Sequence, residues 1–264
     1  MKRSRSVLNL LKPHTNCFTK GSGLFGALGH GSFRDNLSFK AVDAPPGMES
    51  MRFKRVSAGA AHSAVVTENG DLVLFGRPYD FQSMLRLNRI RKVSKSLARL
   101  VAGAAFKADQ NTGIFPSPVA FISNGSIVDV SCSAGFTVAL AGDGRVYAVG
   151  SNRWGQCALD SSQTMAMQPV RVPMECKITA IDTGLQHAIA VCEEGRVYTW
   201  GKGNRGKLGD GDNNDQVNIP RRVGAIKDIV AVGAGFGHSV AIGHDGAIYL
   251  WGRGMSDVKK ESKY

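Results

Sequence analysis

Three histidines occupy the same position in a repeated segment, and histidine is the side chain whose pKa best suits general acid–base chemistry near neutral pH. They are His62, His187 and His238, and each follows a glycine by three residues; these glycines are Gly59, Gly184 and Gly235. Catalytic groups usually come from different positions that converge on one substrate, whereas identical positions in successive repeats serve the same purpose in each. We therefore predict that the three imidazoles are structural and that each bonds backbone within its own repeat.

Sequence motifs for other catalytic chemistry are missing. The chain has no GxSxG, no GxxxxGK followed by Ser or Thr, and no HExxH. Gly201–Gly206 reads GKGNRG, similar to a dinucleotide-binding GxGxxG, but the matching GSNRWG at Gly150–Gly155 indicates that it belongs to the repeat. A dinucleotide site also needs a βαβ setting, which this pattern lacks. We predict a protein without enzymatic activity and without a cofactor.

The five cysteines form neither a CxxC pair nor a spacing typical of metal ligands. They are Cys17, Cys132, Cys157, Cys176 and Cys192. An odd and scattered set is typical of a reducing compartment, where free thiols pack in the core. We predict no metal site.

The elements that must position these residues come from an internal repeat. Four stretches of 21 residues align without a gap, and their starts lie 74, 51 and 51 residues apart. They are Val56–Gly76, Val130–Gly150, Ile181–Gly201 and Val232–Gly252. A period near 50 residues predicts stacked or radially arranged units, each too small to bury a core alone.

Each copy reads as an antiparallel β-hairpin. Two short apolar runs flank an acid or amide followed by glycine, which is the strongest local signal for a tight turn. The turn glycines are Gly70, Gly144, Gly195 and Gly246. The chain is therefore predicted to be all-β.

Side-chain size follows the repeat as well. Small residues recur in the first run at Val65, Ala139, Ala190 and Ala241, and bulkier ones close the second run at Phe75, Val149, Trp200 and Trp251. Each bulky residue is followed by a glycine, namely Gly76, Gly150, Gly201 and Gly252. Small residues near a crowded axis and large ones farther out suit the blades of a β-propeller.

These motifs resemble the regulator-of-chromosome-condensation repeat, a propeller blade of about this period. The resemblance rests on the glycine–histidine pairs, on Tyr198–Gly201 and Tyr249–Gly252, and on the GKLG tail at Gly206–Gly209. It covers roughly Phe18 to Gly254 and departs from the family pattern at Ser133 and Phe136, which replace the usual glycine and histidine. It implies a propeller of about four to five blades with one helical insertion, fewer than the family's usual seven.

The two ends of the chain carry complementary parts of a repeat. Gly21–His30 is a GxLG-type tail, and the last copy ends at Gly252 without one. The N-terminal segment could complete the last blade and remove open sheet edges. The alternatives are that further blades join in an assembly, or that the chain is a piece of a longer protein.

We expect three parts: a basic tail or targeting segment at residues 1–17, propeller repeats at 18–255, and a charged tail at 256–264. Met1–Arg34 contains no Asp or Glu in a chain of net charge +12. A basic, acid-free and weakly amphipathic start predicts mitochondrial targeting. The alternatives are a disordered tail, or a short nuclear address at Lys2–Arg5, with a nuclear or cytoplasmic location.

A basic insertion separates the first two copies, at residues 80–107. Its cations are Arg86, Arg89, Arg91, Lys92, Lys95, Arg99 and Lys107. Apolar residues at helical spacing predict one amphipathic helix packed through Ile90, Val93, Leu97, Leu100, Val101 and Ala104. The cations are then either solvated or dock on RNA, an acidic protein or an anionic membrane surface.

Three functions remain open from the sequence. The first is a non-enzymatic scaffold that binds a protein partner through its loops and its basic insertion. The second, implied by the resemblance, is guanine nucleotide exchange on a small GTPase. The third is an organellar RNA- or ribosome-associated factor that binds through the basic helix. No run of apolar residues is long enough for a transmembrane helix.

Overall fold

In the computed structural model, β-strands are the main regular secondary structure of the described residues. The described residues are 17–45, 52–77, 89–90, 92–94, 96–98, 100, 115–122, 126–211 and 214–253. The first half of this region contains β1 (Phe18–Gly21), β2 (Asn36–Ala41), β3 (Phe53–Ala58), β4 (His62–Thr67), β5 (Leu72–Gly76), β6 (Phe115–Ile122), β7 (Ile127–Cys132), β8 (Phe136–Ala141) and β9 (Val146–Ser151). The second half contains β10 (Met165–Val172), β11 (Ile178–Thr183), β12 (His187–Cys192), β13 (Val197–Lys202), the short 3₁₀ helix η1 (Asn204–Gly206), β14 (Gln216–Arg222), β15 (Ile229–Ala234), β16 (His238–Gly243) and β17 (Ile248–Gly252).

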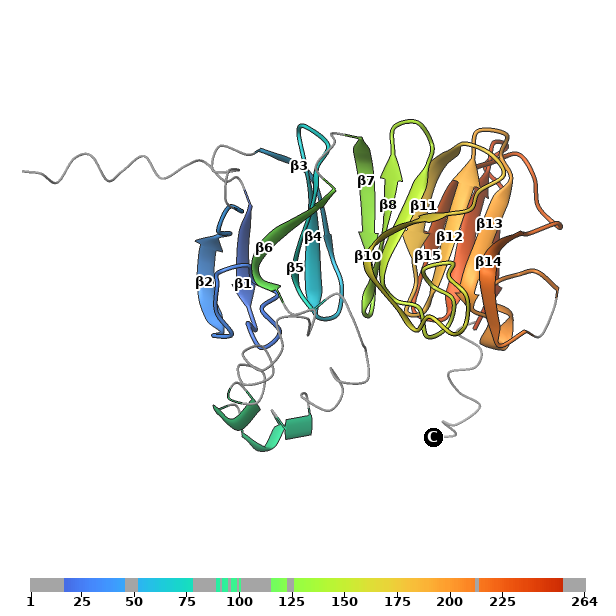
Figure 1. The fold of residues 1–264 in the computed structure, drawn as a ribbon. Helices are drawn as coiled ribbons and strands as arrows, with labels where there is room; N and C mark the ends of the chain where they lie inside the picture. The colour runs from blue at the N-terminus through green and yellow to red at the C-terminus, as the bar shows by residue number, and fades with distance from the viewer. Residues whose placement is uncertain are drawn as a thin grey trace, which may run out of the picture.

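These strands form five antiparallel sheets that follow one another in chain order (Figure 1). The sheets are β1–β2, β3–β6, β7–β10, β11–β14 and β15–β17. In each of the last four sheets, strands that follow one another in the chain lie side by side as an antiparallel meander, as in a propeller blade. The predicted all-β propeller architecture is confirmed.

The hairpin turns form where the sequence places glycine. Gly70, Gly144, Gly195 and Gly246 all have φ between 72° and 86°. Glycine adopts this left-handed conformation without the steric cost that a Cβ would bring. The turns fix the register, so that His187 lies opposite Gly201 and Ala190 opposite Tyr198.

Neighbouring sheets pack through their first two strands. β7 contacts β3 and β4, β11 contacts β7 and β8, and β15 contacts β11 and β12. The small residues Ala139, Ala190 and Ala241 stand on the second strand of each sheet and are buried there. They therefore lie between sheets, next to the innermost strands rather than on them.

Each large residue at the end of a third strand packs beneath the tail of the preceding blade. Trp200 is fully buried, and its Nε1 donates to the Gln156 carbonyl oxygen at 2.9 Å. A Cβ on Gly29 would meet the ring of Phe75, and a Cβ on Gly209 would meet the ring of Trp251. Tail glycines thus leave room for the next blade's aromatic residue.

Val149 is the exception to this arrangement. The blade before it, β3–β6, is not followed by a GxLG tail, and the residue at the aromatic position is correspondingly small. Val149 packs instead with Leu74 and Val130 in the core between β3–β6 and β7–β10.

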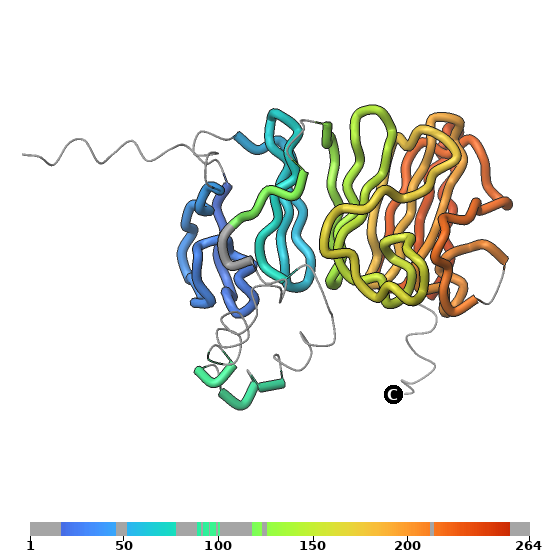
Figure 2. The backbone as a smooth tube through the Cα atoms, in the orientation of Figure 1, coloured from blue at the N-terminus to red at the C-terminus, as the bar shows by residue number. Residues whose placement is uncertain are grey.

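The N-terminal strands lie against β3–β6, so they do not complete the last blade. Val42 packs with Val65 and Phe75, and the backbone tube places β1–β2 and β15–β17 at opposite ends of the row of sheets (Figure 2). Thr19 Oγ1 donates to the Leu28 carbonyl at 2.6 Å, as Thr199 Oγ1 does to Leu208 at 2.6 Å. β1 and β2 therefore correspond to the outer two strands of a blade. They pair with each other while β15–β17 form a separate sheet, so this segment does not complete the last blade in this structure.

Candidate functional site

Two of the repeated histidines join neighbouring blades. His62 Nε2 lies 2.8 Å from Thr137 Oγ1, and His187 Nε2 lies 3.1 Å from Ser239 Oγ. Both rings are buried, and burial lowers the pKa to about 4 for His62 and to about 3 for His187. The expectation of bonds to backbone within the same blade is wrong, because each ring reaches a hydroxyl on the next blade.

The glycine before each histidine allows this approach. A Cβ on Gly59 would meet the Ser133 carbonyl oxygen and the His62 ring, and a Cβ on Gly184 would meet the Gly235 carbonyl oxygen and the His187 ring. The second blade, β7–β10, departs from the pattern and uses another bond. There Phe136 is fully buried and Ser133 Oγ donates to the Gly184 carbonyl. His238 is half-buried on the last sheet, beside Gly235.

A second series of bonds links the innermost strands. Ser57 Oγ accepts from the Cys132 amide at 2.9 Å, and Asp182 Oδ2 accepts from the Ala234 amide at 2.8 Å. Between them, the hydroxyls of Ser131 and Thr183 lie 2.7 Å apart. These polar residues are occupied in holding sheets together, which explains them without catalysis.

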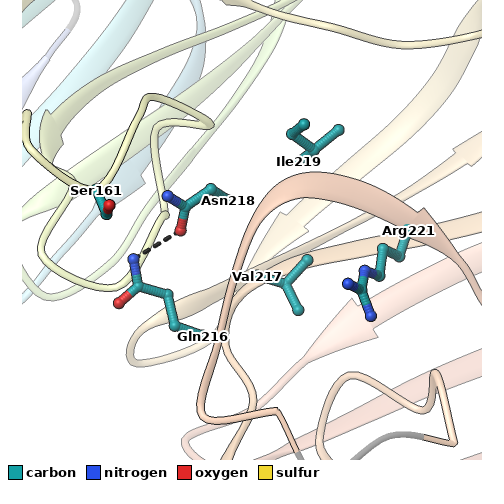
Figure 3. Close-up of a pocket in the computed structure, with 6 residues that line it drawn as sticks. All are labelled: Ser161, Gln216, Val217, Asn218, Ile219 and Arg221. Carbon is teal, nitrogen blue, oxygen red and sulfur yellow. Dashed lines mark hydrogen bonds between the residues drawn. The ribbon is translucent and has the colours of Figure 1, made fainter.

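An open depression of about 600 Å³ lies along β14 (Figure 3). Its lining comes from β14 and from Ser161 in a loop of the preceding blade. The Gln216 side-chain amide donates to Asn218 Oδ1 at 2.6 Å, and Arg221 pairs with Asp210 at 3.6 Å. The amides of Gln216 and Asn218 bond each other, and Arg221 is paired with an acid, so these three side chains are engaged within the protein.

A smaller, basic pocket of about 220 Å³ lies at the end of the blades where β13 stops and the β15–β16 connection passes. Four cations line it: Lys202, Arg205, Lys207 and Arg253. Leu185, Gln186, Asn204, Phe236 and Gly237 complete the wall, so the lining contains no acidic residue. We call this the loop-end pocket.

The glycine-rich tail after β13 builds this pocket. Gly206 and Gly209 adopt positive φ, and the turns between them bury Leu208 in the core between β7–β10 and β11–β14. The Lys207 carbonyl accepts from Ser239 Oγ at 2.9 Å, which ties the tail to the next blade. Lys202 Nζ rests 4.0 Å from the centre of the Trp154 ring, a cation–π contact.

The opposite end of the blades carries the hairpin turns and is acidic. A depression there is lined by Glu193, Glu194, Asp228 and Asp245, together with Lys227 and His244. Between these two depressions the charge differs in sign: the loop-end pocket is basic and the depression at the turns of the last two sheets is mainly acidic.

Matches to known proteins agree with this geometry. Models of the regulator of chromosome condensation (RCC1) repeat match residues 143–191 and 194–242, and a second repeat model matches 127–156 and 178–207. The chain belongs to the RCC1 repeat family. The matches together span β7 to β16. Those of the second model begin at the first strand of a blade, and those of the first model begin at the hairpin turn between its second and third strands.

Relatives and a solved structure extend the match over most of the chain. It is 30% identical over 241 residues to the mitochondrial RCC1 domain-containing protein RUG3 of Arabidopsis thaliana, covering 89% of this chain and 49% of the relative. It is 28% identical over 244 residues to the secretion-regulating guanine nucleotide exchange factor of Bos taurus, covering 89% and 47%. The crystal structure of human WBSCR16 superimposes with a TM-score of 0.71 at 19% identity, covering 90% of this chain and 56% of that one. The chain spans about half the length of the curated relatives named here.

The insertion of this RCC1-repeat chain is helical at residues 89–90, 92–93, 96–98 and 100, and Ile90 of the predicted stripe packs as expected. The Ser94 amide donates to Ile90 and the Ala98 amide to Ser94, at 2.8 and 3.1 Å. Ala98 is fully buried with Leu24, Phe25 and Ala61. Val93, Leu97 and Leu100, expected to pack, are exposed. The predicted packing stripe is wrong in these three residues.

Only part of the predicted basic surface can be placed. Arg89 and Lys92 are exposed, whereas Arg86, Arg91, Lys95, Arg99 and Lys107 lie outside the described residues, as do residues 1–16 and 254–264. Ala61 occupies the repeat position of Gln186, so the helix and the loop-end pocket lie at the same end of the blades. RNA binding by this helix stays a prediction.

Two further results concern ligand classes. Among residues with described placement, no group of three or more His, Cys, Asp or Glu side chains could hold a metal ion. Within that same region, no helix is long and apolar enough to cross a membrane. The five cysteines are free thiols.

Proposed function

We propose that the chain is a non-enzymatic scaffold that binds a protein partner at the loop end of its blades. The observation that carries this proposal is the loop-end pocket, where four cations and the exposed Phe236 stand on loops held by rigid sheets. Exposed aromatic residues and arginines are enriched where proteins bind one another. Loops on a fixed scaffold suit recognition more than they suit chemistry.

Cross-linking and purification of the tagged protein from cells tests the scaffold. We expect a partner whose recovery falls at least fivefold in the variant Phe236→Ser combined with Arg253→Gln. The matched control is Lys227→Gln, which removes an exposed cation at the acidic end. Equal recovery with both variants would place the partner elsewhere and refute the proposal.

Regulation of a small GTPase is the second candidate, and it comes from a relative. The secretion-regulating guanine nucleotide exchange factor is named for that activity, and a shared fold alone does not transfer it. Release of a fluorescent guanine nucleotide from a panel of small GTPases is the direct test. Faster nucleotide release from one GTPase would support exchange activity. No effect on any GTPase would favour the scaffold function without exchange.

We further propose a mitochondrial location. It rests on the acid-free sequence of Met1–Arg34 and on the mitochondrial relative RUG3. A fluorescent protein fused behind residues 1–34 should enter mitochondria, and a version with Lys2, Arg3 and Arg5 changed to Glu should not. Nuclear accumulation of the first fusion would contradict the proposal.

A further inference from the structure

Lys207 is a largely buried lysine at the base of the loop-end pocket. The residue is 4% exposed, and among the described residues its ammonium forms no ion pair with a carboxylate. Burial and the nearby charge of Lys202 lower the pKa of Lys207 to about 8. Removing a lysine from water costs folding free energy, so the position requires an explanation.

The fold itself does not require a lysine there. The same position of the tail is Ala27 in the N-terminal segment and Gln156 after the second blade. The backbone at Gln156 makes the bond that supports Trp200, and Lys207 likewise uses its backbone carbonyl for Ser239. Its ammonium is therefore additional to the structural role of the tail.

Three other cations, Lys202, Arg205 and Arg253, line the loop-end pocket together with Lys207. Arg205 and Arg253 are exposed, and the backbone of Arg205 is left-handed, with φ 64°. Guanidinium groups bind oxyanions through paired hydrogen bonds, and lysine supplies a point charge. The pocket is thus arranged for a multiply charged oxyanion.

The size of the pocket limits its ligand. About 220 Å³ is below the range of roughly 300–1,000 Å³ typical of small-molecule sites. The end of one side chain fits, and a nucleoside with its phosphate does not. Exposed Phe236 beside the pocket offers an apolar contact for the neighbouring residue of a polypeptide.

We propose that the loop-end pocket binds the phosphate group of a phosphorylated side chain on a partner protein. This inference rests on the proposed scaffold function and adds the chemistry of the partner. A phosphate carries close to two negative charges and three acceptor oxygens, which matches a pocket lined by two lysines and two arginines better than a single carboxylate does.

The test uses three pentapeptides that differ only in the central residue, which is phosphoserine, glutamate or serine. Isothermal titration calorimetry should show at least tenfold tighter binding of the phosphoserine peptide than of the glutamate peptide, weakening as salt is raised. Lys207→Met and Arg253→Gln should each reduce that affinity at least tenfold. Lys54→Gln, an exposed cation on β3, is the matched control and should leave it unchanged.

Thermal unfolding separates a binding role of Lys207 from a structural one. Lys207→Met keeps the methylene packing and removes a charge that burial disfavours, so we expect its melting temperature to equal or exceed that of the wild type. A lower melting temperature would assign Lys207 to the fold and overturn the proposal. Equal affinity for the glutamate peptide, or tighter binding of a short single-stranded RNA than of the phosphopeptide, would overturn it too.

Phosphatase treatment distinguishes failure of this inference from failure of the scaffold. If a cellular partner stays bound after dephosphorylation, the scaffold function is retained and phosphate binding is refuted. A chain that recovers no partner before treatment would refute both.

Discussion

At the scale of single residues, the repeat motif is a device for joining blades. Glycine leaves space for a histidine ring, and the ring bonds a hydroxyl 75 residues later for His62 and 52 residues later for His187. Both imidazoles must stay neutral to remain buried. Stability therefore depends on pH.

Because the pKa of each ring is lower in the native state than in the unfolded chain, the unfolded chain takes up protons first as the pH falls below about 6.5. We expect the free energy of unfolding to decrease between pH 6.5 and 5 by about 1.4 kcal/mol per pH unit for each histidine. Urea titrations at several pH values measure this. His62→Gln should reduce the slope, His244→Gln on an exposed turn should not, and an unchanged slope in the first variant would contradict the assignment.

The glycine beside each ring is testable at the same scale. Gly184→Ala places a methyl group against the Gly235 carbonyl and the His187 ring, and we expect a loss of about 1–3 kcal/mol of unfolding free energy. Gly224→Ala is the control, because a Cβ there meets nothing within 4 Å. Comparable losses in the two variants would show that close packing at Gly184 is unimportant.

At the scale of elements, each tail supports the aromatic residue of the next blade. Trp200 is enclosed between β7–β10 and β11–β14 and bonds Gln156, whereas Trp251 is only half-buried on the last sheet. Trp200→Ala should cost about 3–5 kcal/mol, and Trp251→Ala should cost clearly less. Denaturant unfolding of both variants measures the difference, and equal costs would mean that the last blade is as well enclosed as the inner ones.

The sequence predicted the blades better than the contacts between them. Hairpin strands follow from local patterns, namely alternating apolar runs around Asn-Gly or Asp-Gly. The hydroxyl partner of each histidine is far along the chain and varies between Thr137 and Ser239, so no local pattern indicates it.

The packing face of the helix and the loop-end pocket could not be predicted from the sequence for a related reason. Hydrophobicity favours Val93 and Leu97 as packing residues, but the close approach to Ala61 selects the smaller Ala98. Lysine is normally exposed, so only the fold shows that Lys207 is buried. The basic composition was evident from the sequence, whereas the gathering of four cations in the loop-end pocket required coordinates.

At the scale of the whole molecule, one face of the last sheet is exposed to solvent. In each inner sheet the equivalent face is covered by the next sheet. Ile248 and Leu250 are 73% and 64% exposed, while Val197 and Thr199 at the same positions of the preceding blade are fully buried. Ile242, which pairs with Ile248 across β16 and β17, is 40% exposed and extends this apolar surface. Contiguous apolar surface of this kind drives association.

We therefore expect the isolated chain to self-associate through this face as its concentration rises. Light scattering after size-exclusion chromatography should show a growing mass for the wild type and a constant mass for Ile248→Lys combined with Leu250→Lys. The double variant should keep the wild-type melting temperature, because both side chains already face solvent. Val197→Lys, which buries a charge at the equivalent position, should unfold the protein, so a wild-type monomer at all concentrations would show that this face needs no cover.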